Sequence, residues 1–121
     1  MVAKTVRVGI ATHSELRRRA LDIAGGRRRR HPEEPRIWFT SIQSLAKVLS
    51  EPNRRLLRLI DEKRPSSLKE LEALTGRRVS NLSRTLKTMS RYGLVRLHTG
   101  KRGTILPEVV IRGIRMDLPL V

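Results

Sequence analysis

Cysteine is absent from this chain of 121 residues, and aromatic residues are nearly absent. Without cysteine, disulfide bonds, thiolate metal sites and cysteine nucleophiles are excluded. The aromatic residues are Trp38, Phe39 and Tyr92, so the chain has few rings on which the bases of a single strand could stack. Among nucleic acids, this shortage favours a duplex as the partner.

Long apolar runs and acidic residues are also scarce. No apolar run approaches the roughly 18 residues of a membrane span, and the N-terminus lacks the apolar core of a secretion signal. We therefore expect a cytoplasmic protein without a membrane partner. Asp and Glu number 11 against 27 Lys and Arg, which gives a formal net charge of +16. Such a charge attracts polyanions, and nucleic acid is the first candidate.

The residue types of a catalytic or metal site are present but scattered. His13, His31 and His98 lie far apart, and none has a partner at metal-ligand spacing. Acidic residues such as Glu70 stand among arginines and lysines on predicted helices, where capping and side-chain pairing explain them. Gly25-Gly26 is followed by arginines, not by the Gly-Lys-Ser pattern of a phosphate loop. The sequence therefore predicts no enzyme, no metal and no cofactor.

The N-terminal segment is predicted to be a basic extension. Residues 5–10 alternate apolar with other side chains, as a short strand does. Thr12 or Ser14 is then suited to cap a helix over residues 14–24. Residues 27–35 combine four arginines with prolines and form a solvated linker, with direct nucleic-acid contact as the alternative.

We expect a domain boundary near residue 35. Residues 1–35 would form the strand–helix extension and its linker, and residues 36–121 the main domain. The length of the chain suits one compact domain with such an appended element. Trp38 and Phe39 lie near the start of the main domain. Their more common use is in the core, and the alternative is to anchor a dimer interface.

Apolar periodicity and capping signals predict four helices in the main domain. They cover residues 41–50, 51–63, 67–75 and 79–92. The first has one stripe that we expect to be buried, made of Ile42, Leu45, Val48 and Leu49. Pro52 suits the first turn of the second helix. Ser67 and Glu70 match a capping box at the start of the third, and Gly76 ends it.

The period then changes to that of a β-hairpin. Residues 94–99 and 104–106 are predicted strands, and residues 100–103 are a turn with a glycine at each end. Lys101 and Arg102 lie at the tip of this hairpin. The whole chain is therefore predicted to be α+β.

Two further β-like segments follow the hairpin, over residues 109–111 and 114–118. We expect Pro107 and Pro119 to keep them short. Residues 6–8 are one possible partner for residues 114–118, either within one chain or between two chains. The sequence leaves both arrangements open.

The third and fourth helices, joined by a short turn, predict a helix-turn-helix. Leu82, Leu86 and Met89 are expected to point inward, so the polar side chains between them face outward. Asparagine can pair with adenine and arginine with guanine, whereas small hydroxyls approach phosphates. The candidate DNA-binding residues, including those at the start of the helix and at the hairpin tip, are Arg77, Arg78, Ser80, Asn81, Ser83, Arg84, Thr85, Lys87, Lys101 and Arg102.

The alternative is that Arg84, Lys87 and Arg91 form only the solvated face of an amphipathic helix, as most basic helix faces do. The combination of signals favours the DNA hypothesis. A capped short helix, a tight glycine turn, a Ser-Asn-Leu-Ser-Arg helix and a basic hairpin occur in succession. We therefore predict a winged helix-turn-helix, with helices followed by a β-hairpin wing and an N-terminal strand–helix extension.

Several motifs resemble known families. Leu71-x-x-Leu74-Thr75-Gly76, the run from Val79 to Lys87 and Tyr92-Gly93-Leu94-Val95 resemble the winged-helix core of MarR-like and ArsR-like regulators, over about residues 41–106. Three motifs are more similar to a family of small prokaryotic, often archaeal, DNA-binding proteins, some of them antitoxin-like. These motifs are Trp38-Phe39-Thr40-Ser41, the run from Ser80 to Lys87 and Ile114-Arg115-x-Asp117-Leu118-Pro119-Leu120.

This resemblance implies a homodimer that regulates transcription by binding a two-fold symmetric operator. It also implies autoregulation beside a toxin-like gene as one possibility. Metal sensing of the ArsR-like kind is not expected, because the chain has no cysteine and its histidines are scattered.

Two other functions stay open at the level of sequence. One is an adaptor or antitoxin that holds a toxin-like or other protein partner through residues 1–35. The other is a binder of structured RNA, or of nucleic acid without sequence preference, which the net charge of +16 alone would support.

Overall fold

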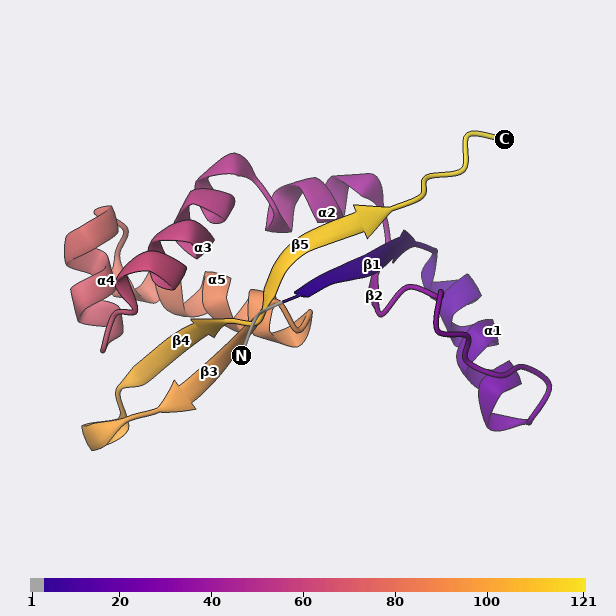
Figure 1. Cartoon of the computed structure of the whole chain (residues 1–121), viewed down its shortest axis with the longest axis horizontal. Coiled ribbons are helices and arrows are strands. Elements are labelled where there is room, and N and C mark those ends of the chain that lie inside the picture. The colour runs from indigo at the N-terminus through magenta and orange to yellow at the C-terminus, as the bar shows by residue number, and fades with distance from the viewer. Residues whose placement is uncertain (1–3) are drawn as a thin grey trace. The chain divides into compact units, whose positions relative to one another are not determined.

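The computed structural model describes residues 4–121 and has an α+β fold, as predicted (Figure 1). The helices of this described part are α1 (His13–Ala24), α2 (Ile42–Val48), α3 (Glu51–Lys63), α4 (Leu68–Thr75) and α5 (Val79–Arg91), with one 3₁₀ turn, η1 (Lys101–Gly103). Its strands are β1 (Lys4–Ile10), β2 (Ile37–Phe39), β3 (Val95–Thr99), β4 (Ile105–Val109) and β5 (Ile111–Met116).

The chain forms two compact units. One covers residues 48–112 and holds α3 to α5 with the β3–β4 hairpin; we call it the helix–hairpin unit. The other combines residues 5–47 with residues 113–121 and holds α1, α2 and a three-stranded sheet; we call it the sheet unit. Residue 35, where the sequence suggested a boundary, lies inside the sheet unit, because β2 directly after it pairs with β1.

The sheet unit is built around β1. This strand lies between β2 and β5, and β2 runs parallel to it with Val8 opposite Ile37 and Ile10 opposite Phe39. Figure 1 shows the arrow of β5 running in the same direction as that of β1. Of the two arrangements left open for the C-terminal strand, pairing with the N-terminal strand of the same chain is confirmed. Phe39 is fully buried and Val8 is 1% exposed, so Phe39 is a core residue.

The predicted N-terminal helix is confirmed as α1. Thr12 is its N-cap, and the Thr12 hydroxyl accepts a hydrogen bond from the backbone N–H of Glu15 at 3.2 Å. The helix ends at Gly25, and Gly26 follows with a φ of 76° that favours glycine. α1 contributes no buried residue, so the sheet supplies most of the small core of this unit.

The predicted buried stripe of the first main-domain helix is wrong. α2 has only seven residues, no residue of α2 is buried, and Ile42 is 46% exposed. Its start is as expected, since the Ser41 hydroxyl accepts a hydrogen bond from the Ser44 N–H at 3.0 Å. Leu45, Val48 and Leu49 are half-buried, so periodicity identified the helix but overestimated the burial of its apolar side.

The helix–hairpin unit has the larger core. Its fully or almost fully buried side chains are Leu56, Ile60, Leu71, Leu82, Leu86, Met89, Leu94 and Val95. Ser50 caps α3, whose first turn contains Pro52, as predicted. α3 ends at Arg64, which adopts a left-handed conformation with φ of 46°. Ser67 caps α4 as predicted, and Gly76 ends it with φ of 75°.

The predicted hairpin is confirmed, but its second strand is longer than expected. β3 and β4 are antiparallel, with Val95 opposite Val109 and Leu97 opposite Pro107. Pro107 therefore lies within a strand and does not shorten it. In a two-stranded ribbon each strand has one unpaired edge, so a proline nitrogen on that edge costs no ladder hydrogen bond. Gly113, expected to separate two segments, also lies inside a strand, β5.

Candidate nucleic-acid interface

α5 turns its apolar side chains into the helix–hairpin unit and its polar side chains outward. Leu82 and Met89 are fully buried and Leu86 is 1% exposed. The exposed candidates on this helix are Ser80, Asn81, Arg84 and Lys87, whereas Ser83 and Thr85 are half-buried. The predicted orientation of the helix is confirmed. It follows from the spacing of the apolar residues, which places them along one side.

The turn between α4 and α5 is fixed by local hydrogen bonds. The N–H of Gly76 donates to the Glu72 carbonyl at 2.8 Å, and the Thr75 hydroxyl accepts from the N–H of Arg77 at 3.1 Å. The Glu72 carboxylate accepts from the N–H of Val79, the first residue of α5, at 2.9 Å. Two helices are thereby joined across three residues.

Glu72 is a positioning residue that sequence reasoning missed. The N-cap of α5 is Arg78, whose side chain makes no capping hydrogen bond. A helix with a cation at its N-cap needs an acceptor from elsewhere, and that need is the signal that could have identified the carboxylate. A negative charge at this point also complements the helix dipole.

The Arg77 side chain is half-buried and makes three hydrogen bonds within the protein. Its Nε donates to Asn81 Oδ1 at 2.8 Å, its Nη1 to Asn53 Oδ1 at 3.1 Å and its Nη2 to Thr85 Oγ1 at 3.0 Å. Asn53 belongs to α3, so the guanidinium joins α3 to two successive turns of α5. Sequence reasoning missed Asn53, because nothing local shows that an α3 side chain meets the start of α5.

These hydrogen bonds determine which polar atoms of Asn81 and Thr85 are left to bind a ligand. Arginine only donates, so the Asn81 atom that faces Arg77 must be the oxygen. The Asn81 amide nitrogen stays on the other side of the side chain, on an exposed residue. Thr85, half-buried, has its hydroxyl oxygen committed to Arg77. The structure therefore brings Arg77, Asn81 and Thr85 together as one hydrogen-bonded group.

The hairpin tip presents two cations. Lys101 and Arg102 are exposed on η1, and Arg102 has a φ of 58°. The tip is closed by the N–H of Gly100, which donates to the Thr104 carbonyl at 2.7 Å, and by the Thr104 hydroxyl, which donates to the Lys101 carbonyl at 2.8 Å. The Lys101 and Thr104 carbonyls thus accept hydrogen bonds within the turn, and the Lys101 and Arg102 side chains are exposed.

No acidic residue occurs between Glu72 and Glu108, a segment that contains all ten candidate DNA-binding residues. Its basic residues are Arg77, Arg78, Arg84, Lys87, Arg91, Arg96, Lys101 and Arg102. The acid at each border is engaged by the protein, because Glu72 caps α5 and Glu108 lies beside His98. α5 and the hairpin therefore form a continuous cationic segment.

Glu108 is held on the hairpin by its neighbours. His98 Nε2 lies 2.9 Å from Glu108 Oε1, and Arg96 Nη1 lies 3.9 Å from the same oxygen. The hydrogen bond with His98 lowers the pKa of Glu108 below its ordinary value, and the charges of Arg96 and Arg64 act in the same direction. The carboxylate thus stays ionised and ties β3 to β4.

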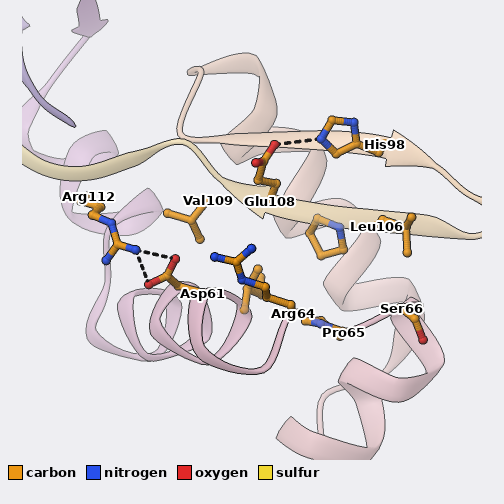
Figure 2. A pocket seen from close by; sticks show the side chains of 11 residues that line it. Asp61, Arg64, Pro65, Ser66, His98, Leu106, Glu108, Val109 and Arg112 are labelled. Carbon is orange, nitrogen blue, oxygen red and sulfur yellow. Dashed lines mark hydrogen bonds and ion pairs between the residues drawn. The ribbon is translucent and has the colours of Figure 1, made fainter. Parts of the chain in front are cut away.

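A cavity of about 490 Å³ lies between the end of α3 and the hairpin, within the helix–hairpin unit. Figure 2 shows Asp61 bonded to Arg112 on one side and His98 to Glu108 on the other. Arg112 Nη2 lies 2.9 Å from Asp61 Oδ2. The Arg64 side chain extends into the space between Asp61 and the hairpin (Figure 2). Most of the charges around this cavity are therefore already paired.

Two further findings concern the described residues alone. Over residues 4–121, no group of three or more His, Cys, Asp or Glu side chains is placed to hold a metal ion. In the same part of the chain, no helix combines the length and the apolar character that crossing a membrane requires.

Comparison of the sequence with known proteins identifies the family to which the chain belongs. No curated protein and no solved structure matches the chain. Residues 48–115 match the HVO_A0114 family. The match begins where the helix–hairpin unit begins and includes α3, α4, α5 and both hairpin strands. The likeness to MarR-like and ArsR-like regulators stays a prediction. Because the match spans more than half of its 121 residues, the chain belongs to the HVO_A0114 family.

Proposed function

We propose that the chain is a transcriptional regulator that binds double-stranded DNA through a winged helix-turn-helix. The observation that supports this most strongly is the outward face of α5, which is polar, basic and free of acidic residues. α4 and α5 would form the helix-turn-helix, with α5 as the helix that enters the major groove. The β3–β4 hairpin would be the wing.

The side chains on α5 have the chemistry that base and phosphate contacts require. Arg84 is exposed and can donate two hydrogen bonds to the O6 and N7 atoms of guanine. Ser80 and Ser83 are short donors that allow a close approach to phosphates. Lys87 is exposed one turn beyond Ser83 and supplies a positive charge near the backbone.

The Glu72 carboxylate already occupies the N–H of Val79, so a phosphate at the start of α5 would meet the remaining N–H groups of the first turn and Arg78. Backbone N–H groups at a helix N-terminus carry partial positive charge. Arg78 is exposed there, and its side chain makes no capping bond. We assign phosphate contact to Arg78 and base contact to Arg84. Arg77 is assigned to neither, because Asn53, Asn81 and Thr85 occupy its guanidinium.

Lys101 and Arg102 would contact phosphates beside the groove. They lie at the exposed end of the hairpin, and neither forms an ion pair with a described residue of the helix–hairpin unit. A phosphate contact is insensitive to sequence, whereas a bidentate base contact is not. The two groups of residues therefore differ in a measurable way.

The test is a comparison of Arg84→Ala with Lys101→Ala on a cognate duplex from a footprint of the chain's own promoter region. Loss of Arg84 is expected to cost roughly 1–3 kcal/mol and to relax base preference at one position. Loss of Lys101 is expected to weaken cognate and random duplexes alike and to reduce the slope of log affinity against log salt by about 1. Lys63→Ala, at the end of α3, is the matched control for the loss of one charge.

Equal effects of Arg84→Ala and Lys101→Ala on cognate and random DNA would contradict these roles. Equal affinity of the unaltered chain for cognate duplex, random duplex and structured RNA would support a binder without sequence preference instead.

We also propose a homodimer that matches a two-fold symmetric operator. Light scattering during size-exclusion chromatography, with and without the duplex, measures that state directly.

An antitoxin or adaptor function remains the second candidate from the sequence, with residues 1–35 as its binding segment. Residues 1–35 include β1, the central strand of the sheet unit. Removing them would therefore disrupt a folded unit as well as any partner site. Charge reversal at exposed arginines of α1, such as Arg17→Glu, tests a partner site without that loss.

A further inference from the structure

The sheet unit contains a cavity of about 710 Å³ that the proposed DNA-binding surface does not use. Side chains from α1, from the loop between α1 and β2, and from β2 line it. The charged and aromatic members are Arg19, Arg30, His31, Glu34, Arg36 and Trp38. All of them belong to the sheet unit.

The acid in this cavity is neutralised by the protein. The Glu34 carboxylate accepts hydrogen bonds from Arg19 and, at 3.2 Å, from Arg28. Burial raises the pKa of Glu34, but the hydrogen bonds and charges of the two arginines outweigh it, so the pKa lies below its ordinary value. Glu34 is therefore ionised and fully engaged, and it does not repel an incoming anion as a free carboxylate would.

Two guanidinium groups in the cavity lack such a partner. Arg30 and Arg36 form no ion pair with any residue of the described segment 5–121. The other acids of the sheet unit that pair with arginine are committed elsewhere, Asp22 to Arg27 and both Glu33 and Asp117 to Arg7. The positive charge of the cavity is thus not cancelled within its own unit.

His31 adds a third donor. Its Nδ1 accepts a hydrogen bond from the backbone N–H of Glu33 at 3.1 Å. The neutral ring therefore carries its proton on Nε2, which leaves that nitrogen as a donor. Imidazole and guanidinium donors together match an oxyanion with several acceptor oxygens.

Part of the cavity wall is restrained, whereas the donors Arg30, His31 and Arg36 are exposed side chains. Pro32 and Pro35 restrict the loop, and Trp38 is half-buried in β2. The Arg19 guanidinium lies 5.4 Å from the centre of the Trp38 ring, and a Cβ atom on Gly9 would come within 2.5 Å of the same ring. The ring is therefore fixed in place as a wall.

We propose that this cavity binds a phosphate group, with Arg30, Arg36 and His31 as the donors. Guanidinium groups bind phosphate through paired, charge-assisted hydrogen bonds. The phosphate can belong to a DNA backbone or to a small phosphorylated molecule, and both offer the same oxygens. This inference goes beyond the proposed function, since it concerns neither α5 nor the hairpin.

The chain's single tryptophan makes the site observable, because Trp38 lines the cavity. The full chain is titrated with pyrophosphate at constant ionic strength, and separately with a duplex, while Trp38 emission is recorded. Isothermal titration calorimetry with the same two probes detects binding even if it does not change the Trp38 emission. We expect saturable binding of at least one probe.

The double variant Arg30→Gln with Arg36→Gln is expected to weaken that binding about tenfold or more, since it removes the charge-assisted hydrogen bonds of both guanidinium groups. The matched control, Arg17→Gln with Arg29→Gln, removes the same charge from exposed arginines that do not line the cavity. We expect the control to change affinity less than about twofold. Circular dichroism melts establish that both variants fold.

Each outcome decides the matter. Pyrophosphate binding that the cavity variant weakens and the control variant keeps identifies a small phosphorylated ligand. Duplex binding with the same pattern identifies the DNA backbone as the source, and either result supports the site. If neither probe binds, or if the control variant loses as much affinity as the cavity variant, the cavity is not a phosphate site. Loss of sequence-specific DNA binding in the Arg84→Ala variant leaves this result unaffected.

Discussion

Arg77 and Arg78 are neighbours with the same side chain and different surroundings. Both were predicted to approach DNA from the start of α5. The guanidinium of Arg77 instead meets three oxygen acceptors from α3 and α5, and its residue is half-buried. Arg78 is exposed and caps nothing. Adjacent positions at a helix start point in different directions, and only the tertiary structure shows which one meets the protein.

The pair gives a matched test of stability. Arg77→Ala removes three charge-assisted hydrogen bonds at a partly buried site, so we expect the free energy of unfolding to fall by about 2 kcal/mol. Arg78→Ala removes an exposed side chain that forms no hydrogen bond or ion pair with the described residues 4–121, so we expect a change within about 0.5 kcal/mol. Urea denaturation of the two variants measures both values. Equal losses would mean that the Arg77 hydrogen bonds do not contribute to the fold.

Arg77 also fixes the orientation of the Asn81 side chain. With Arg77 in place, the Asn81 oxygen is held toward the protein and the amide nitrogen is left for a ligand. Arg77→Lys keeps the charge but cannot make three forked hydrogen bonds. If Asn81 contacts a base, this variant is expected to lose affinity for the cognate duplex more than for a random one. Fluorescence anisotropy on both duplexes makes the comparison.

At the level of elements, the helices were predictable because their signals are local. Ser50, Ser67 and Thr12 each cap the helix that follows, and the periodicity of Leu82, Leu86 and Met89 gave both the extent and the inward face of α5. The hairpin was predictable for the same reason, since a turn with glycine at each end marks it.

What sequence reasoning could not supply depends on distant partners. The strand β2 was not predicted, because three residues give no period, and its identity rests on pairing with β1. The exposure of Ile42 could not be foreseen either, since periodicity does not show what lies opposite a helix. Glu72 and Asn53 position α5 through contacts that no local pattern reveals.

The cap of α4 departs from the predicted capping box in one detail, and that detail has a pH dependence. Ser67 accepts from the N–H of Glu70 as expected, but the Glu70 carboxylate accepts from the N–H and the hydroxyl of Ser66, at 3.0 and 2.6 Å, and not from the N–H of Ser67. The hydroxyl and then the N–H of Ser66 hold the pKa of Glu70 below its ordinary value.

A lowered pKa in the folded state fixes the sign of the effect. The ionised carboxylate stabilises the fold above its unfolded pKa of about 4.3, and this contribution disappears as the pH falls through the lower folded value. Glu70→Gln is therefore expected to lose stability at pH 7 and to show a smaller further loss between about pH 5 and pH 3 than the unaltered chain. Thermal melts across that range measure this, with Glu62→Gln on α3 as a control.

At the scale of the whole molecule, the two units differ in how much they bury. The helix–hairpin unit has a core drawn from all of its helices and from its hairpin. The buried side chains of the sheet unit come from β1, β2 and the residue after β1, while α1 and α2 bury none. A unit with fewer buried apolar contacts opens at a lower free energy.

We therefore expect backbone amides of β1 and β2 to exchange with solvent faster than those of α5, as measured by hydrogen exchange and mass spectrometry.

Phe39→Ala would remove a fully buried ring from the sheet unit at a cost of about 3 kcal/mol, and Met89→Ala would make a cavity in the helix–hairpin unit. Because each unit has its own core, Phe39→Ala should accelerate exchange in β1 and β2 and leave α5 protected, while Met89→Ala accelerates exchange in α5. If Phe39→Ala exposes α5 to the same degree, the two units unfold as one, and the chain's stability cannot be divided between them.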